Sequence, residues 1–218
     1  MTRFQTIEKR LFDIIVSFIG ITVLFLPFLL LALLVKATSR GPIFFAQRRI
    51  GRHGIPFTCV KLRTMSVDSE NQGTITTSSD SRIAPVGRVL RKFKLDELPQ
   101  LWNVLLGKMS FVGPRPDVPG YADMLSGSDR AILELRPGIT GPASLYFRNE
   151  EELLAGQADP KQYNDSVIWP TKVRINAEYR ADWSFVRDIG YIRITILPVL
   201  DRVFRSLLEG PPGPYTRL

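Results

Sequence analysis

The chain has 218 residues, of which 44% are hydrophobic, and its formal net charge is +8. This composition supports one domain of ordinary size with a packed core and excludes a wholly disordered chain. Its single cysteine, Cys59, and single histidine, His53, exclude an internal disulfide and a cysteine metal cluster. They also argue against a histidine-ligated zinc site and a serine–histidine mechanism.

The positive charge is concentrated in one part of the chain. Residues 36–115 contain 14 Lys/Arg and 5 Asp/Glu, whereas the remainder contains 15 and 16. Such a local excess predicts an anionic partner, which could be phosphate, lipid headgroups or nucleic acid. Aromatic residues interleaved with Lys and Arg are sparse in this stretch, so we expect no nucleic acid partner.

An apolar run without a charged residue, IIVSFIGITVLFLPFLLLALLV, occupies residues 14–35. About 20 apolar residues suffice to cross a bilayer core, and no small-residue cleavage site follows that would mark a signal peptide. Basic residues flank both ends, so the charge rule accepts both ends on the cytoplasmic side. Pro27 removes a backbone hydrogen bond and favours a kink. A re-entrant helix that bends at Pro27 and a straight span therefore both remain open.

The next segment, GPIFFAQRRIGRHGIPFTCVKLRTM (residues 41–65), combines glycines with short β-like runs and predicts a hairpin. If residues 57–65 form a strand, Lys61 and Arg63 share one face at the two-residue period. Residues 66–82 are polar and rich in turn formers, which predicts a surface loop.

A basic amphipathic helix is predicted for residues 84–94, APVGRVLRKFK, in which four apolar residues recur at helical spacing. It lies either at a membrane surface or in a core with one solvated face, and the neighbouring anchor favours the membrane. Residues 191–208 have a similar pattern, broken by Pro198, and residues 209–218 are expected to form a loose tail.

Two adjacent carboxylates, Asp96 and Glu97, stand in the segment KFKLDELPQLWNVLLGKMSFVGPRP. Pro99 is tolerated only in a first turn, so we expect a helix to begin near Asp96. Asp96 would then be the N-cap and Glu97 a first-turn residue. The expected apolar face of this helix consists of Leu95, Leu98, Leu101, Trp102 and Leu105. The simplest interpretation of the acids is helix capping and stabilisation of the helix dipole.

Three features favour a chemical role for the pair. A helix start is expected to lower the pKa of Asp96 and keep it ready to act as a nucleophile or metal ligand. Nearby cations would screen the attack of a carboxylate on a phosphate. Arg115 stands between two prolines, which limits its backbone freedom and prepares it for a bidentate phosphate contact.

The motif KLDELPQLWNVLLGKMSFVGPRP (residues 94–116) resembles the signature of the monotopic phosphoglycosyl transferase family of bacterial sugar transferases. Three further motifs resemble the same family: FAQRRIGRHGIPFTCVKLRTM (45–65), RPGITGPA (136–143) and YRADWSFVRDI (179–189). Together with the anchor they cover most of the chain in the order the family has them.

The resemblance implies an α+β fold that is mainly helical. It implies an N-terminal re-entrant membrane helix, a small β-hairpin, and amphipathic interfacial helices around a compact catalytic domain. We assign residues 1–36 to the anchor, 37–208 to the catalytic domain and 209–218 to the tail. The expected location is the cytoplasmic face of the bacterial inner membrane.

The resemblance also implies Mg²⁺-dependent transfer of a sugar 1-phosphate from a UDP-sugar to undecaprenyl phosphate, with release of UMP. This is the first membrane step of glycoconjugate biosynthesis, and it proceeds through a covalent aspartyl phospho-sugar. Asp96 matches the nucleophile and Glu97 its assistant, and both are candidate Mg²⁺ ligands. Candidate substrate- and phosphate-binding residues are Lys61, Arg63, Arg91, Arg115, Arg136 and Asp188. The sugar is not identified, and monomer and homodimer both remain open.

Two departures from the family pattern leave alternatives open. Leu26 precedes Pro27 where family anchors often carry serine, which would help to satisfy backbone groups that the proline frees. Residues 145–170 form an acidic extension, which either shapes the sugar pocket or is a solvated helix, the usual surface arrangement. A competing function is a non-enzymatic, membrane-anchored basic scaffold for anionic lipid or nucleic acid. A polytopic transferase is disfavoured because the chain has a single apolar run.

Overall fold

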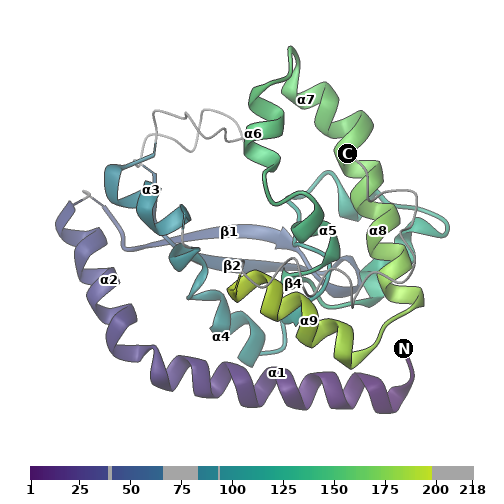
Figure 1. The fold of residues 1–218 in the computed structure, drawn as a ribbon, viewed down its shortest axis with the longest axis horizontal. Coiled ribbons are helices and arrows are strands. Elements are labelled where there is room, and N and C mark those ends of the chain that lie inside the picture. The colour runs from purple at the N-terminus through teal and green to yellow at the C-terminus, as the bar shows by residue number, and fades with distance from the viewer. Residues whose placement is uncertain (39–40, 66–82, 93, 198–218) are drawn as a thin grey trace.

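The computed structural model describes residues 1–38, 41–65, 83–92 and 94–197. Helix α1 (Arg3–Val23) runs beneath the other elements, and α2 (Phe25–Thr38) turns up beside them (Figure 1). The strands are β1 (Phe44–Ile50), β2 (Pro56–Leu62), β3 (Ser110–Val112) and β4 (Gly138–Thr140). The remaining α-helices are α3 (Pro85–Lys92), α4 (Gln100–Leu105), α5 (Pro142–Tyr146), α6 (Glu150–Ala155), α7 (Pro160–Tyr163), α8 (Trp169–Ala181) and α9 (Phe185–Ile196).

Short helical turns connect these elements. Within the described ranges four are 3₁₀ turns: η1 (Arg52–Gly54), η3 (Leu95–Glu97), η4 (Ala122–Met124) and η5 (Asp129–Glu134). One π-helical turn, η6 (Asn164–Ile168), leads directly into α8. The prediction of a mainly helical fold with a small hairpin is confirmed.

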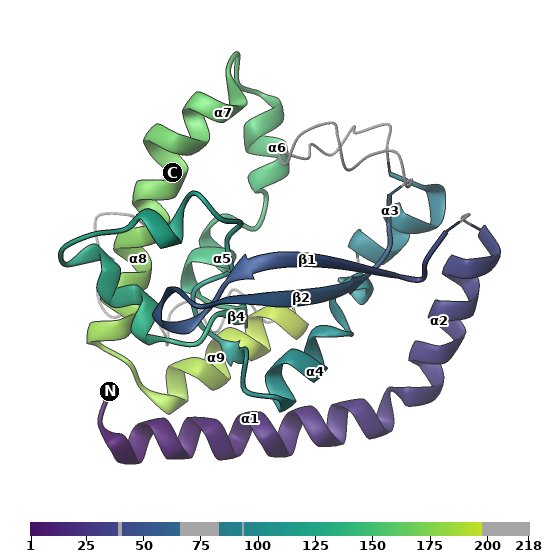
Figure 2. The same ribbon diagram turned by 180° about the vertical axis from the view of Figure 1, so that it is seen from behind.

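The predicted hairpin is confirmed as the antiparallel pair β1–β2, which crosses the middle of the molecule (Figure 2). Gln47 pairs with Cys59 and Phe45 with Lys61, so these side chains share one face. That face is turned inward, since Phe57 and Cys59 on it are buried with Val104 and Met109. The strand ends at Leu62, and Arg63 follows it as a buried residue.

The bend in the apolar segment lies at Leu24, three residues before the predicted position at Pro27. The reason is that proline lacks an N–H, so the carbonyl four residues earlier, on Val23, loses its helical partner. The axes of α1 and α2 meet at 63°. Among the described residues neither helix alone has the length and apolar character of a span, whereas the bent pair together has both.

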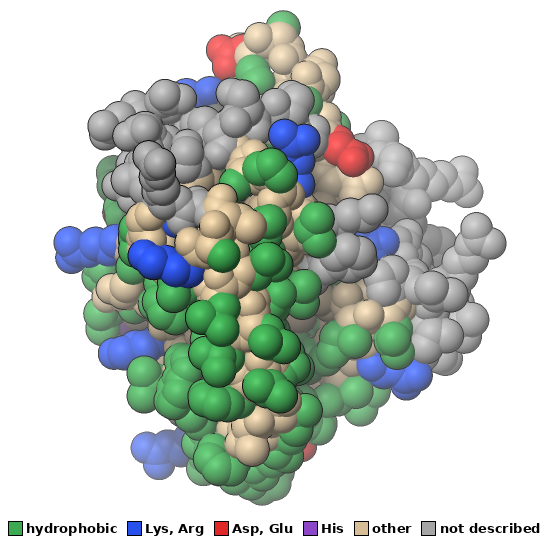
Figure 3. Space-filling view, turned by 90° about the vertical axis from the view of Figure 1, so that its left-hand side faces the viewer, with side chains coloured by type: hydrophobic (Ala, Val, Ile, Leu, Met, Phe, Trp, Pro, Cys, Tyr) green, Lys and Arg blue, Asp and Glu red, His purple; other side chains and the backbone are tan. Residues whose placement is uncertain are grey.

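The outer faces of α1 and α2 are apolar and exposed. Phe4, Leu11 and Phe18 recur along α1, and leucines continue the surface along α2. Figure 3 shows this apolar face from the side on which α2 lies. The exposed apolar face of α1 begins at Phe4, ten residues before the uncharged run that begins at Ile14. The sequence did not reveal this earlier part, because charged residues alternate with apolar ones there.

The inner face of α1 is polar and is bound to the rest of the protein. Arg10 donates to the backbone carbonyls of Val104 and Leu105 at the end of α4, both at 2.7 Å. Asp13 is buried and accepts from Ser110 Oγ at 3.1 Å and from the Phe111 N–H at 3.0 Å. The first half of α1 is therefore attached to both α4 and β3.

Helix α4 packs with the opposite face to the one that we predicted. Gln100, Asn103 and Val104 are buried, whereas Trp102 is 54% exposed. Asn103 Nδ2 donates to the Thr58 carbonyl at 2.9 Å, so this side chain occupies the open edge of β2. The hydrogen bond to the strand edge turns the polar face inward and leaves the leucines facing α1 or solvent.

The two remaining amphipathic segments are only partly described. Helix α3 confirms the predicted basic helix, with Leu90 buried and Val89 exposed. Helix α9 begins at Phe185, six residues before the predicted start. The predicted loop at 66–82, Phe93, and the segment from Pro198 through the tail at 209–218 lie outside the described residues.

Replacing Asp13 by alanine should destabilise the protein. It leaves the Phe111 N–H and the Ser110 hydroxyl without their acceptor, which costs about 2 kcal/mol. For a chain of this size the loss corresponds to a fall in Tm of about 4–8 °C. Thermal unfolding of the detergent-purified protein measures it. Glu8→Ala removes a carboxylate from the same helix and is the control; an equal fall for both variants would contradict the role of Asp13.

Candidate active site

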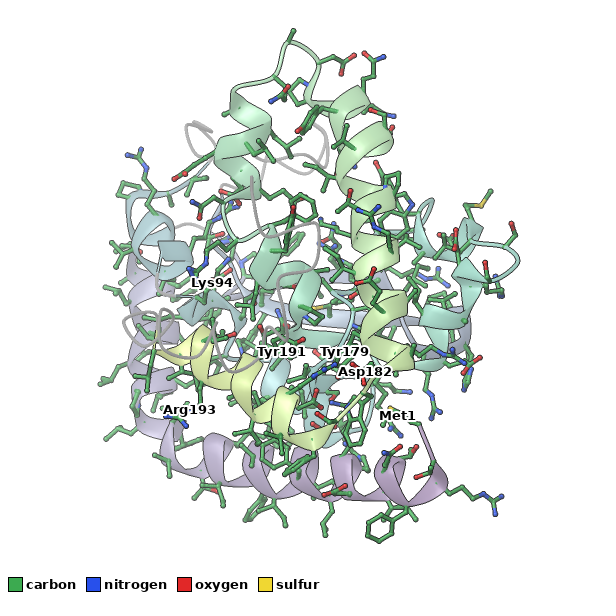
Figure 4. All side chains as sticks on the ribbon, turned by 45° about the vertical axis from the view of Figure 1, so that its right-hand side comes forward. Met1, Lys94, Tyr179, Asp182, Tyr191 and Arg193 are labelled. Carbon is green, nitrogen blue, oxygen red and sulfur yellow. The ribbon has the colours of Figure 1, made fainter. Side chains whose placement is uncertain are left out.

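The acid pair lies in a 3₁₀ turn, not at the start of the α-helix. Asp96 and Glu97 belong to η3, and Pro99 is the residue that precedes α4. The prediction of Asp96 as the N-cap is therefore wrong. Lys94 opens the turn in the left-handed conformation (φ 57°, ψ 21°), which costs a non-glycine residue roughly 1–2 kcal/mol. Strain of this kind is found at functional sites, and Figure 4 labels Lys94 at this position.

Glu97 joins two cations from distant parts of the chain. Its Oε1 accepts from Lys61 Nζ of β2 at 2.8 Å and from Arg115 Nη2 at 2.7 Å. Burial alone would raise the pKa of Glu97, but the charges of Arg115 and Lys61 outweigh burial and hold this pKa far below its usual range. Glu97 is therefore an ionised, buried carboxylate that holds Lys61 and Arg115 beside Asp96.

Asp96 is buried and differs from Glu97 in its environment. Burial raises the pKa of Asp96, and the charges of Lys61, Lys94 and Arg91 oppose this rise without cancelling it. The prediction of a lowered pKa is wrong, because the loss of hydration outweighs any benefit from a short helical turn. Among the described residues, Asp96 Oδ1 has no hydrogen-bond partner. A buried carboxylate oxygen without a partner is suited to a cation or to an electrophilic phosphorus.

The segment that carries Arg115 is held from two sides. Gly138 of β4 donates its N–H to the Pro114 carbonyl at 2.8 Å, and Arg49 Nη1 of β1 donates to the Pro116 carbonyl at 3.0 Å. Only glycine fits at position 113, where the chain passes close to the segment that leads into β4, because a Cβ there would lie 2.2 Å from the carbonyl oxygen of Arg136. The prolines restrict this backbone, and the two neighbouring elements fix its position.

Asp117 is a further acid beside this segment that the sequence did not single out. Burial raises the pKa of Asp117 to about 6, although Lys172, Arg49 and Arg115 lower it. Its backbone carbonyl accepts from the Ile50 N–H at 2.9 Å. An isolated acid after a proline motif carries no sequence signal of such an environment.

The acidic extension contacts cations near the site through the first turn of α6, while Glu152, Leu153 and Ala155 of the same helix are exposed. Glu151, in the first turn of α6, forms an ion pair with Arg91 of α3. Glu150 pairs with Lys172 of α8 at 2.7 Å and acts electrostatically on Arg115. The first turn of α6 therefore contacts Arg91, which acts on Asp96, and Lys172 of α8. Three adjacent glutamates are also typical of an exposed helix start, so the sequence could not separate the two roles.

Three of the candidate binding residues lie around the acid pair: Lys61 and Arg115 contact Glu97, and Arg91 acts on Asp96. Arg136 does not join them by any contact found in the described part of the chain, and its Nε donates to the Gly107 carbonyl beyond α4. Phosphate binding by Arg63, which is buried directly after β2, stays a prediction.

Asp188 lies in a separate buried network between α1, α8 and α9. It accepts from Tyr179 Oη at 2.7 Å and from Trp183 Nε1 at 3.0 Å, and it forms an ion pair with Lys9 of α1. Tyr179 meets Tyr191 edge to face with a centroid separation of 6.1 Å (Figure 4). These contacts make Asp188 a residue that attaches α1 to the C-terminal helices, and no described contact takes it to the acid pair.

The fit of a divalent cation depends on Asp96. Within the described ranges, no group of three or more His, Cys, Asp or Glu residues could hold a metal ion. Mg²⁺ characteristically binds through one or two carboxylates and completes its shell with water and substrate phosphates. The buried, partnerless oxygen of Asp96 fits that pattern, whereas Glu97 Oε1 is already bound to two cations.

Comparison with known proteins identifies the family. The family described as bacterial sugar transferase matches residues 4–202. The chain belongs to this family. The match spans α1, α2 and the elements around the acid pair, and it confirms the family resemblance seen in the motifs.

Curated relatives of this sugar transferase come from several bacteria. It is 34% identical over 206 residues to the exopolysaccharide production protein ExoY of Sinorhizobium fredii, covering 87% of this chain and 84% of the relative. It is 35% identical over 199 residues to the UDP-glucose:undecaprenyl-phosphate glucose-1-phosphate transferase of Caulobacter vibrioides, covering 89% and 70%. A protein of the same name from Klebsiella pneumoniae is 37% identical over 194 residues, covering 86% and 39%.

Replacing Glu97 by glutamine should reduce both activity and stability. The variant leaves Lys61 and Arg115 beside a neutral amide, and we expect a loss of about 2–3 kcal/mol, since the Arg115 side chain is 39% exposed. The folded pKa of Glu97 lies below its ordinary value of 4.5, so this stability is present above pH 4.5 and is lost as pH falls further.

Urea unfolding of wild type and Glu97→Gln between pH 3.5 and 7 tests this. The difference between them should be largest at neutral pH and shrink below pH 4.5. Glu134→Gln, which removes the acid from an exposed pair with Arg180, should change stability by less than about 1 kcal/mol. A pH-independent difference for Glu97→Gln would contradict the ionised state of Glu97.

Replacing Glu151 by glutamine should make Arg91 more available to an anionic substrate. Because the carboxylate of Glu151 competes with a phosphate for Arg91, we expect the KM for the donor to fall by about two- to fivefold, the scale of an exposed ion pair. Glu152→Gln, on the same helix but exposed, is the control and should leave KM unchanged. A raised KM for Glu151→Gln would show instead that the pair organises the site.

Proposed function

We propose that this bacterial sugar transferase moves a sugar 1-phosphate from a UDP-sugar to undecaprenyl phosphate and releases UMP. The step would begin the assembly of a glycoconjugate at the membrane. The observation that carries the proposal is Asp96, a buried carboxylate with an unbonded oxygen, surrounded by cations. Two of the relatives with 35% and 37% identity are named as transferases that use UDP-glucose and undecaprenyl phosphate.

In the proposed first step, a carboxylate oxygen of Asp96 attacks the phosphorus that carries the sugar. The bond from that phosphorus to the bridging oxygen breaks, UMP leaves with this oxygen, and an aspartyl phospho-sugar remains. Lys61, Arg91 and Arg115 offset the charge of the diphosphate, because two anions approach each other only when screened. Glu97 holds two of these cations in place throughout.

In the second step, an oxygen of the lipid phosphate attacks the same phosphorus. The bond to Asp96 breaks, the carboxylate is regenerated, and a polyprenyl diphosphate sugar forms. Asp96 returns to its starting state without an external proton donor or oxidant. The raised pKa of Asp96 means that the attacking, ionised form depends on the cations around it and becomes less populated as pH falls.

Mg²⁺ is proposed as the cofactor, with Asp96 as the residue best suited to hold it and Glu97 beside it. When bound, the cation would neutralise charge on the diphosphate and on its leaving group. The protein's own contribution is the buried position of Asp96 and the fixed cations, which exclude water and orient the donor.

The apolar surface of α1 and α2 supports a membrane location for the reaction. Its exposed phenylalanines and leucines are suited to lipid contact, and both flanks of the bent pair are basic. We propose that the pair enters the inner membrane from the cytoplasmic face and returns to it. The site would then lie near headgroup depth, where a soluble nucleotide sugar and a lipid phosphate can meet.

A non-enzymatic basic scaffold explains the site less well. A scaffold needs cations that are free to bind an anionic partner, whereas Lys61 and Arg115 both donate hydrogen bonds to the buried carboxylate of Glu97. A scaffold also gives no reason to bury Asp96 with an unbonded oxygen, which costs free energy without a stabilising partner.

Asp96→Asn should abolish transfer, with a fall in kcat of about 10³-fold or more, because an amide does not replace the carboxylate as nucleophile. The measurement is Mg²⁺-dependent UMP release from UDP-glucose and UDP-galactose with undecaprenyl phosphate present. Incubation with donor alone should add a sugar phosphate to the wild-type peptide that contains Asp96, as seen by mass spectrometry. Full turnover by Asp96→Asn would refute the nucleophile, and a wild type inactive with every UDP-sugar would refute the proposed function.

A further inference from the structure

A cleft of about 760 Å³ lies beside β1, where Gln47 and Arg48 line it. This volume lies within the range of roughly 300–1,000 Å³ that is typical of small-molecule sites. Its walls come from the chain after the proline motif, from η6 and from the start of α8. They include the aromatic and apolar residues Tyr121, Met124, Leu125 and Trp169, and the charged residues Lys161 and Asp165.

The aromatic wall of the cleft is held rigidly. The rings of Tyr121 and Trp169 meet edge to face with centroids 5.4 Å apart. Tyr121 Oη donates to Asp165 Oδ1 at 2.8 Å, and Asn164 Nδ2 donates to Tyr121 Oη at 3.2 Å. Both partners belong to the π-helical turn η6, and such turns are frequent at functional sites. The cleft therefore presents fixed aromatic surface with polar groups beside it.

Hydrogen bonds, together with the peptide linkage between Arg115 and Pro116, connect the cleft to the acid pair. Gln47 lines the cleft, and its Oε1 accepts from Arg49 Nη2 at 2.5 Å. Arg49 also donates to Pro116, the neighbour of Arg115, which binds Glu97. Gln47 pairs with Cys59, two residues before Lys61, so the Cα atoms of Gln47 and Lys61 are about 8 Å apart by standard strand spacings.

We infer that this cleft holds the nucleoside of the donor, with the base stacked on the Tyr121–Trp169 wall. The inference rests on the proposed function, in which Asp96 attacks the phosphorus next to the sugar. The sugar must then lie close to Asp96, and the nucleoside, on the far side of the diphosphate, needs a second subsite further away. The diphosphate would run past Gln47 and Arg49 from one to the other.

The position and chemistry of the cleft favour a nucleoside over the lipid. Helices α2 and α8 lie on opposite sides of the hairpin, and α1 runs beneath both (Figure 1). The exposed leucines of α2 are therefore remote from α8. A flat, uncharged base gains about 1–3 kcal/mol from stacking on an aromatic side chain. Arg48 at the cleft adds positive charge suited to the phosphate next to the ribose, whereas Lys161 is paired with Asp165 at 2.6 Å.

Two variants test the assignment through the affinity for UMP. Trp169→Leu removes the stacking surface, and Met124→Trp fills the cleft from a side chain that is 75% exposed, so it should not disturb folding. Both should raise the Kd for UMP, measured by calorimetry on the detergent-purified protein, and the KM for the UDP-sugar by about tenfold or more. The KM for undecaprenyl phosphate should stay unchanged. Val186→Trp, on a residue that is 76% exposed on α9, is the matched control.

A second ligand separates stacking from a general loss of binding. The base of 5,6-dihydro-UMP is not planar and stacks poorly, so the wild type should bind it more weakly than UMP, and Trp169→Leu should lose this preference. Unchanged UMP affinity in both variants, or a preference for UMP that Trp169→Leu retains, would overturn the assignment. These outcomes are distinct from failure of the proposed function, in which the wild type itself releases no UMP.

Discussion

The carboxylate of Glu97 is buried between Lys61 and Arg115, and the arrangement of the site depends on this interaction. Lys61 comes from the hairpin and Arg115 from the segment after β3, so one acid joins two elements that are otherwise separate in the chain. A buried ion pair is costly to form, and it persists only when its geometry is good and its partners are held. Here the hairpin and the proline segment hold them. The result is a fixed positive environment next to Asp96.

The two adjacent acids therefore have different roles. Glu97 is ionised and occupied, with a pKa far below its usual range, because two cations contact it. Asp96 has a raised pKa and an oxygen without a partner, because burial removes its hydration and no cation from the described part of the chain forms an ion pair with it. When the surroundings shift the pKa values of two neighbouring acids in opposite directions, one acid can serve as a structural anion and the other as a reactive group.

Helix α1 is bonded to elements on both sides of the site. Arg10 binds the last carbonyls of α4, Asp13 binds β3, and Lys9 pairs with Asp188 near α9. Since α4 follows the acid pair and β3 precedes Arg115, α1 supports both halves of the site. Helix α1 bound in this way fixes the position of its exposed apolar face relative to the site.

The sequence by itself determined the family, the hairpin, the uncharged apolar run and the residues Asp96, Glu97 and Arg115, because these depend on local patterns: alternation, a run without charges, and prolines around a motif. The structure decided that the apolar run is bent and that the bend lies at Leu24. Only the tertiary structure decided that Glu97 is the occupied acid, that Asp188 attaches α1, and that the first turn of α6 reaches Arg91. It also decided which face of α4 is buried, since Asn103 binds the edge of a strand more than 40 positions away. The burial, the pKa and the ion pairing of a residue depend on which distant residues pack against it, and the spacing of residues along the sequence does not reveal those contacts.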